Sequence, residues 1–156
     1  TYGRLYNWNA VMQGENSSNS NPSSVQGVCP DGWHVPSEEE FIELAEYISK
    51  KMGIEIDIYI DFEYVGGFLK SEKGWFNEGN GTNDFYFSAL PAGAKWTDGY
   101  GSIGEYTAWW TSYEHPSFTS PPPKARRYSI NGGNNTLWHN YTYKYVGFSL
   151  RCLRDD

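Results

Sequence analysis

The clearest periodic pattern in the chain predicts a helix over residues 38–52. One face of this helix is apolar and the other is charged, with the apolar positions at Phe41, Leu44, Ala45, Ile48 and Met52. Ser37 and Glu40 stand at the two positions of a capping box, and Gly53 is placed to end the helix. The acidic run 38–40 complements the helix dipole, so we assign it no catalytic role.

Outside this helix the pattern predicts short elements joined by turns. Asn7 is placed to cap a short helix over residues 8–12, and residues 14–24 form a loop rich in Gly, Asn, Ser and Pro. Apolar and acidic residues partly alternate from 54 to 64, which is the period of a half-buried strand. Turn clusters separate five further strand candidates, at 85–90, 108–112, 125–130, 136–141 and 147–153. Two helices and many short strands indicate an α+β fold.

Composition favours a single domain with an aromatic core. The 156 residues suit one domain, and aromatic residues make up 18% of the chain, so their rings must fill much of the core. The net charge of −7 opposes binding to nucleic acid or anionic membranes. No apolar stretch has the length of a membrane span. Because the chain starts at Thr1, we expect a mature or excised segment whose signal or lipoprotein leader has been removed.

The two cysteines, Cys29 and Cys152, stand far apart and form no metal-binding or redox motif. One long-range disulfide is the favoured interpretation, and it would contribute about 4 to 5 kcal/mol in the chain-entropy model. The alternative is two buried free thiols in a cytosolic protein.

No motif in the chain indicates catalysis. Residues 99–104 match G-x-G-x-x-G, but no strand precedes the match and no helix pattern follows it, so we interpret it as a turn. Nucleophilic catalysis needs a base beside Ser or Cys, and His34, His115 and His139 have no companion motif. We expect His34 to be a hydrogen-bonded packing residue, and we expect no zinc site.

Six blocks of sequence carry a specific resemblance when they are taken in order and spacing: YGRLYNWNA (2–10), CPDGWHVPSEEEF (29–41), NGTNDF (80–85), FSALPAG (87–93), WWTS (109–112) and GFSLRC (147–152). Together they resemble the Fibrobacter succinogenes major paralogous domain, almost from end to end. We therefore treat residues 1–156 as one such domain. Members usually carry a further strand before the first block, and we expect that strand and the leader to precede this segment.

The resemblance implies a fold and a location, and no activity. The family is similar to C-type-lectin-like and formylglycine-generating-enzyme-like folds, with two helices, an irregular mixed or antiparallel sheet of short strands and long loops. It places Cys29 near Cys152, as a bridge between the start of the second helix and the last strand. It also implies a secreted, periplasmic or cell-surface protein of bacteria, and it supplies no catalytic residue to carry over.

One loop offers ligands for calcium. Residues 77–84 combine oxygen donors with flexible glycines, and the candidate ligands are Asn77, Glu78, Asn80, Asn83 and Asp84. The spacing is not that of an EF-hand, and the same residues suit an Asx turn without metal. Apart from this calcium ion we expect no cofactor.

The later strands offer a candidate ligand surface that mixes aromatic rings, two arginines and amides: Trp109, Trp110, Tyr113, Glu114, Arg126, Arg127, Tyr128, Asn134, Asn135, Trp138, His139 and Tyr141. Such a mixture suits a glycan, but strand alternation sends every second ring inward, so Trp109, Trp110 and Trp138 could instead be core. We expect a non-enzymatic module that binds a glycan or a protein. The alternative is a structural or display domain of a surface lipoprotein without a small ligand, and an enzyme ranks third. We expect contact with a membrane only through a lipid anchor outside this segment.

Overall fold

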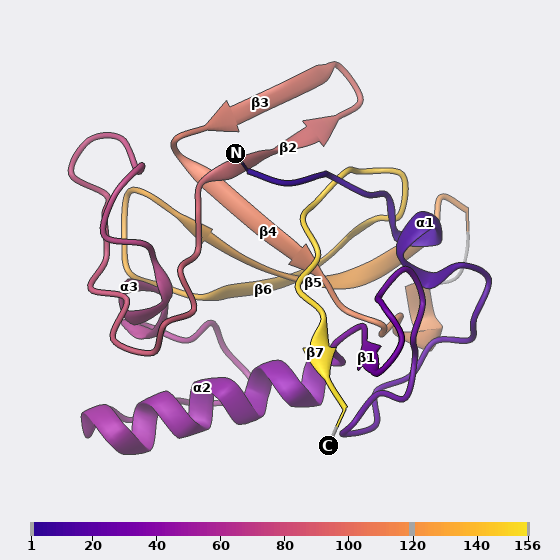
Figure 1. Ribbon diagram of the computed structural model, residues 1–156, viewed down its shortest axis with the longest axis horizontal. Coiled ribbons are helices and arrows are strands. Elements are labelled where there is room, and N and C mark those ends of the chain that lie inside the picture. Colours follow the sequence, from indigo (N-terminus) through magenta and orange to yellow (C-terminus); the bar gives the residue numbers. More distant parts are fainter. Residues whose placement is uncertain (1, 119–120, 156) are drawn as a thin grey trace.

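The computed structural model describes residues 2–118 and 121–155, which form an α+β domain (Figure 1). Its helices are α1 (Trp8–Met12), α2 (Glu38–Met52), α3 (Val65–Leu69) and the 3-10 turn η1 (Pro116–Phe118). Its strands are β1 (Trp33–His34), β2 (Ala92–Trp96), β3 (Gly99–Ile103), β4 (Tyr106–Trp110), β5 (Lys124–Asn131), β6 (Trp138–Tyr143) and β7 (Leu153–Arg154). None of the helices in these residues is long and apolar enough to cross a membrane.

The strands form one mixed sheet of five and one pair. In the large sheet the order is β3-β2-β4-β5-β6, with β2 and β4 parallel and the other neighbours antiparallel. The pair joins β1 to β7. The β2–β3 hairpin forms one edge of the large sheet, at the top of Figure 1, and the α2 helix lies at the bottom of the same view.

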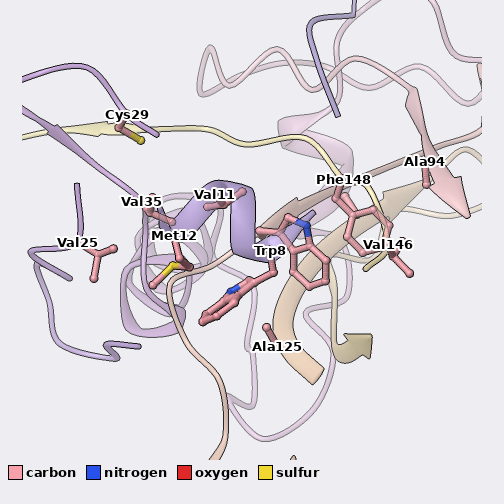
Figure 2. Packing of buried hydrophobic residues seen from close by; sticks show 12 residues of the cluster. Trp8, Val11, Met12, Val25, Cys29, Val35, Ala94, Ala125, Val146 and Phe148 are labelled. Carbon is pink, nitrogen blue, oxygen red and sulfur yellow. The ribbon is translucent and has the colours of Figure 1, made fainter. Parts of the chain in front are cut away.

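Side-chain alternation in the sheet divides the core into two clusters. On one face Trp110 and Ala125 pack with α1 and with Phe148, and Figure 2 shows this cluster around Trp8. On the other face Trp109, Tyr128 and Ile130 pack with α2 and α3. The ring of Tyr128 stacks on Phe41 of α2, with centroids 4.3 Å apart. Aromatic rings therefore fill much of both clusters, as the composition predicts.

The two helices predicted from local signals are confirmed. Ser37 accepts a hydrogen bond from the Glu40 backbone N–H, and the Glu40 carboxylate accepts one from Ser37 N–H at 2.8 Å. Gly53 ends α2 in the left-handed conformation at φ 66°. Asn7 caps α1 by accepting from Ala10 N–H at 2.8 Å.

The disulfide is also confirmed, because Cys29 and Cys152 are bonded with their Cα atoms 5.9 Å apart. The bond joins the segment before β1 to the segment before β7. It lies beside the β1–β7 pair, in which Trp33 faces Arg154 and His34 faces Leu153. The C-terminal segment is thereby attached to the region where α2 begins.

Four predictions of local structure were wrong. Residues 54–64 form no strand apart from an isolated bridge at Phe62, because the alternating residues Ile58 and Ile60 are exposed rather than packed on a neighbour. Residues 85–90 have only a bridge at Ala89, and of 147–153 only the last residue belongs to a strand. The G-x-G-x-x-G segment forms β3 rather than a turn, because it pairs with β2.

Candidate functional site

The Asn-lined pocket, as we call it, is an open cavity of about 770 Å³ that the residues following α3 and the β5–β6 connection help to line. Most of its lining comes from three segments: residues 76–80, the β3–β4 turn with the strand ends beside it (102–106), and the end of β5 with the connection that follows it (131–135). It is lined by Lys70, Phe76, Asn77, Glu78, Gly79, Asn80, Trp96, Ser102, Glu105, Tyr106, Asn131, Gly132, Gly133, Asn134 and Asn135. Two loops that seemed unrelated in the sequence therefore contribute to one site.

Glycine allows these loops to approach each other closely. A Cβ atom added at Gly79 would lie 2.7 Å from the Gly132 carbonyl oxygen, and one at Gly81 would overlap the carbonyl oxygen of Gly67. Backbone hydrogen bonds link neighbouring loops. Gly132 N–H donates to Glu105 O, and Phe76 N–H donates to Gly104 O, both at 2.7 Å. The walls of the pocket are thus held by backbone contacts.

The orientation of three amides in the pocket is fixed by these walls. The side-chain oxygen of Asn131 accepts from the N–H groups of residues 133 and 134, at 3.0 and 3.2 Å. Asn134 accepts from Thr136 N–H, and Asn80 accepts from Trp75 N–H, both at 3.0 Å. A backbone N–H can only donate, so each amide must direct its oxygen to the wall. Their NH₂ groups remain as donors.

Lys70 lines the pocket with only 1% of its surface exposed. Its ammonium donates to the Asn134 carbonyl oxygen at 2.7 Å, and the Asn135 side-chain oxygen lies at 3.5 Å. The Nζ atom is also 5.3 Å from the centre of the Trp75 ring. Burial lowers the pKa of Lys70. No described carboxylate lies within ion-pair distance of this ammonium.

Aromatic rings and carboxylates complete the lining. Phe76 is 57% exposed, and the half-buried rings of Trp96 and Tyr106 have centroids 6.0 Å apart. Burial raises the pKa of Tyr106. Glu78 and Glu105 are exposed and add acceptor oxygens. The pocket therefore presents donors, acceptors and ring surfaces together.

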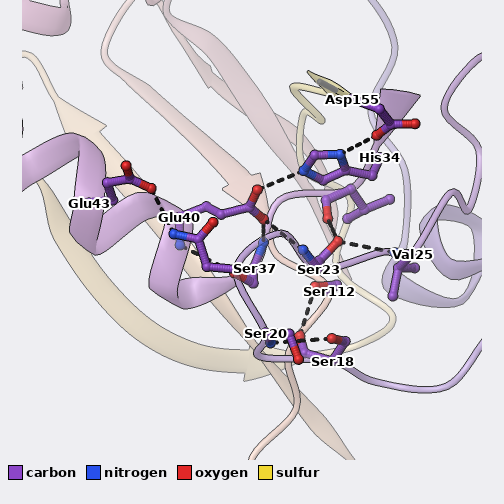
Figure 3. A network of polar contacts seen from close by, with 12 residues as sticks. Ser18, Ser20, Ser23, Val25, His34, Ser37, Glu40, Glu43, Ser112 and Asp155 are labelled. Atoms are coloured by element: carbon purple, nitrogen blue, oxygen red, sulfur yellow. Dashed lines mark hydrogen bonds and ion pairs between the residues drawn. The ribbon is translucent and has the colours of Figure 1, made fainter. Parts of the chain in front are cut away.

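A second pocket, of about 700 Å³, borders His34 and the C-terminal segment. Figure 3 shows the imidazole between two carboxylates: Nε2 lies 2.7 Å from Glu40 and Nδ1 lies 2.6 Å from Asp155. Burial disfavours the charged imidazole, but the hydrogen bonds and charges of Asp155 and Glu40 outweigh it and raise the pKa of His34. Glu40 also accepts from the N–H groups of Ser37 and Ser23.

This network joins the start of α2, β1 and the C-terminal segment. Both nitrogens of His34 are engaged, and the residue is only 5% exposed, so it offers no free general base. The expectation that His34 is a hydrogen-bonded packing residue is confirmed.

The candidate surface predicted from the later strands is divided between the two faces of the sheet. Arg126 pairs with Tyr141 and Tyr128 with His139 on the α2 side, whereas Ser129 pairs with Trp138 on the other side. Neighbouring Arg127 shares that second side, and its guanidinium donates to Thr142 and Ser129.

Several rings of this set lie in the core, as the alternative interpretation held. Trp109 is 5% exposed, and Trp110 and Tyr128 are fully buried, so these three rings belong to the core rather than to an exposed aromatic surface. Trp138 differs, with 36% of its surface exposed. Burial raises the pKa of Tyr128. Tyr141 is half-buried, and its pKa is raised to about 12 by the same cause.

The charged members of the set serve structural contacts. Arg126 forms an ion pair with Glu38 of α2, and its guanidinium carbon lies 4.3 Å from the centre of the Tyr141 ring. Glu114 forms an ion pair with Lys144. His139 contacts the 60–61 segment through Ile60 O at 3.0 Å and Asp61 at 2.9 Å. Tyr113 is half-buried near His115. Only Asn134 and Asn135 of the predicted set line the Asn-lined pocket.

The predicted calcium ligands are also divided. Asn77, Glu78 and Asn80 line the pocket, whereas Asn83 and Asp84 belong to a separate turn. In that turn Asn83 accepts from Ser88 N–H at 2.7 Å, and Asp84 accepts from the Thr82 hydroxyl at 2.5 Å. A bound calcium ion stays a prediction, restricted to the three residues in the pocket.

Sequence reasoning missed most of the other lining residues, notably Lys70, Phe76, Trp96, Glu105 and Tyr106. Lys70 precedes Ser71, Glu72 and Lys73, and this polar context suggests an exposed position. The one local signal was the density of glycines at 66–67, 79–81 and 132–133, which indicates close backbone packing at these places.

Comparison with known proteins identifies the family. Comparison with curated proteins and with solved structures gave no match. The family model of the Fibrobacter succinogenes major domain matches residues 1–154, which is nearly the whole chain and includes every residue of the Asn-lined pocket. The chain therefore belongs to the family of the Fibrobacter succinogenes major domain.

Proposed function

We propose that this domain is a non-enzymatic module that binds a saccharide in the Asn-lined pocket. The observation that carries the proposal is the set of fixed amides. Asn80, Asn131 and Asn134 hold their oxygens against backbone N–H groups, and their NH₂ donors remain beside the carboxylates of Glu78 and Glu105.

A saccharide matches this arrangement in chemistry. Each sugar hydroxyl both donates and accepts, so it needs donors and acceptors close together, and amides with carboxylates supply them. The apolar face of a sugar ring also packs on aromatic surface, which Phe76 and Trp96 supply in the lining of the pocket. Preformed walls lower the entropic cost of binding, because few groups must be ordered.

The same geometry argues against catalysis in this pocket. Glu78 and Glu105 are exposed, and the pocket holds no histidine or cysteine. The cluster of His34 with Glu40 and Asp155 lies outside this pocket, and its hydrogen bonds join structural segments of the fold. For location we propose export to the cell surface, the periplasm or the medium, which the disulfide supports.

A glycan array followed by calorimetric titration of the best ligand tests this proposal. Phe76→Ala removes an exposed ring of the pocket, and we expect it to weaken binding about tenfold, which is 1.4 kcal/mol. Tyr86→Ala is the matched control, because Tyr86 is 88% exposed and lies outside the pocket lining. Equal binding by both variants would place the ligand elsewhere. An array without any ligand would favour the structural or display alternative.

A further inference from the structure

We propose that the Asn-lined pocket prefers saccharides that carry a carboxylate, the class of uronic acids, with the carboxylate directed toward Lys70. The inference rests on the proposed function, because it concerns the same site. It follows from the donors of the pocket, from the charge of Lys70 and from the position of the two glutamates.

The donors of the pocket outnumber the acceptors that remain on its amides. The side-chain oxygen of Asn131 accepts from two backbone N–H groups, and those of Asn80 and Asn134 accept from one each. Each of these amides therefore keeps an NH₂ group as a donor, and only Asn80 and Asn134 keep one further acceptor site each. Asn135 directs its oxygen toward the Lys70 ammonium at 3.5 Å, which leaves its NH₂ group as a fourth donor. A carboxylate accepts hydrogen bonds without donating any, so it complements such a set better than a hydroxyl.

Lys70 adds a charge to these donors. Among the other half-buried cations, Arg126 is paired with Glu38 and Lys144 with Glu114, whereas Arg127 and Arg151, like Lys70, form no described ion pair and donate to neutral oxygens. The Lys70 ammonium contacts only carbonyl oxygens and a Trp ring, and of its contacts only that with Asn134 O, at 2.7 Å, is short. It therefore keeps hydrogen-bonding capacity and a charge that act on the pocket that it lines, although only 1% of the residue's surface is exposed. A charge in this buried position is screened less than one on the surface.

The glutamates determine the orientation of the ligand. Glu78 and Glu105 are exposed, where solvent and salt screen their charges, and they repel a carboxylate from the outer part of the pocket. They accept hydrogen bonds from sugar hydroxyls, which can donate. A uronate thus fits with its carboxylate inward and its hydroxyls outward.

The test uses trisaccharides of galacturonate, glucuronate and mannuronate, each paired with its methyl ester. The ester keeps the ring and its hydroxyls and removes the charge. On the parent protein we expect the best acid form to bind at least about tenfold tighter than its ester. Lys70→Met keeps the apolar stem of the side chain and should bring this ratio to about one. Lys73→Met removes the same charge from an exposed residue outside the pocket lining and should leave the ratio unchanged.

A second variant keeps the proposal testable if Lys70→Met does not fold. Glu105→Gln removes a negative charge from the outer pocket, so it should tighten binding of the acid form more than binding of the ester. Equal binding of acid and ester by the parent, or an unchanged ratio in folded Lys70→Met, would overturn the inference and leave the proposed function standing. Binding of no uronate, ester or neutral array glycan would overturn both.

Discussion

Replacing His34 by Gln should destabilise the domain at acidic and neutral pH and much less at alkaline pH. The imidazolium form donates from both nitrogens, to Glu40 at 2.7 Å and to Asp155 at 2.6 Å. Gln is neutral and can donate to only one of the two carboxylates at a time. The substitution therefore removes one charge and at least one charge-assisted hydrogen bond.

The structure sets the size of this effect. A hydrogen bond to a charged partner contributes roughly 1.5 to 3 kcal/mol. The bond to Glu40 lies in buried surroundings, since the Glu40 side chain is 8% exposed, whereas the Asp155 side chain is 53% exposed, and solvent weakens its contribution. We expect a loss of about 2 to 4 kcal/mol in the free energy of unfolding while His34 is charged.

The pH dependence follows from the raised pKa of His34. A histidine whose pKa is raised by folding stabilises the protein fully below its unfolded pKa of 6.5, and this contribution is lost as the pH rises through the folded-state pKa. Once neutral, the imidazole has one N–H, so one nitrogen faces a carboxylate without a proton. The difference between parent and variant should therefore shrink above neutrality.

Urea unfolding of parent and variant at a series of pH values from acidic to alkaline measures this difference directly. His115→Gln is the control, since His115 forms no described ion pair with a carboxylate. A difference between the parent and His34→Gln that is constant across the series would refute the conclusion that His34 is held as an imidazolium.

The remaining predictions concern the bridge, the cap, the loop packing and the metal. Loss of the disulfide in a Cys29→Ser/Cys152→Ser variant should cost about 5 kcal/mol, because the bond spans 123 residues, and mass measurement of the unreduced protein should show no free thiol. Ser37→Ala should cost about 1 kcal/mol in urea unfolding and leave saccharide affinity unchanged. Gly81→Ala should cost about 1 to 3 kcal/mol, because its Cβ would overlap the Gly67 carbonyl. Added calcium should raise the Tm and a chelator lower it if an ion binds at 77–80, whereas an unmoved Tm would identify an Asx turn alone.

The elements that local chemistry encodes were predictable. The capping box at Ser37 and Glu40 and the apolar spacing behind it placed both ends of α2 correctly. Alternation and turn residues also located β4, β5 and β6 to within about two residues at each end.

The elements that depend on distant partners were not predictable. The α3 helix contains Gly66 and Gly67, which are poor helix formers. It exists because Gly66 packs closely against the 135–136 backbone and Gly67 against the Asn135 side chain. The β2–β3 hairpin is rich in glycine and lacks alternation, so its pairing left no pattern in the sequence. Both are properties of the assembled fold.

The candidate site was likewise predictable only where the signal was local. The Asn-rich loops were recognised as candidates, but as two separate sites, because nothing local shows that 77–80 and 131–135 meet. The rings of Trp109 and Trp110 were ambiguous, since alternation alone does not show that both faces of the sheet are covered. Lys70 reaches Asn134 across 64 positions of sequence, a contact that only the folded chain defines.

The most direct test of the saccharide-binding account compares Asn134→Ala with Trp138→Ala in titrations with the best array ligand. Asn134 lines the Asn-lined pocket, and Trp138 is exposed on the sheet outside it. With both variants shown to be folded, the account predicts that Asn134→Ala binds about tenfold more weakly and that Trp138→Ala binds like the parent. Unchanged binding by Asn134→Ala together with weakened binding by Trp138→Ala would contradict the account and move the site to the strands.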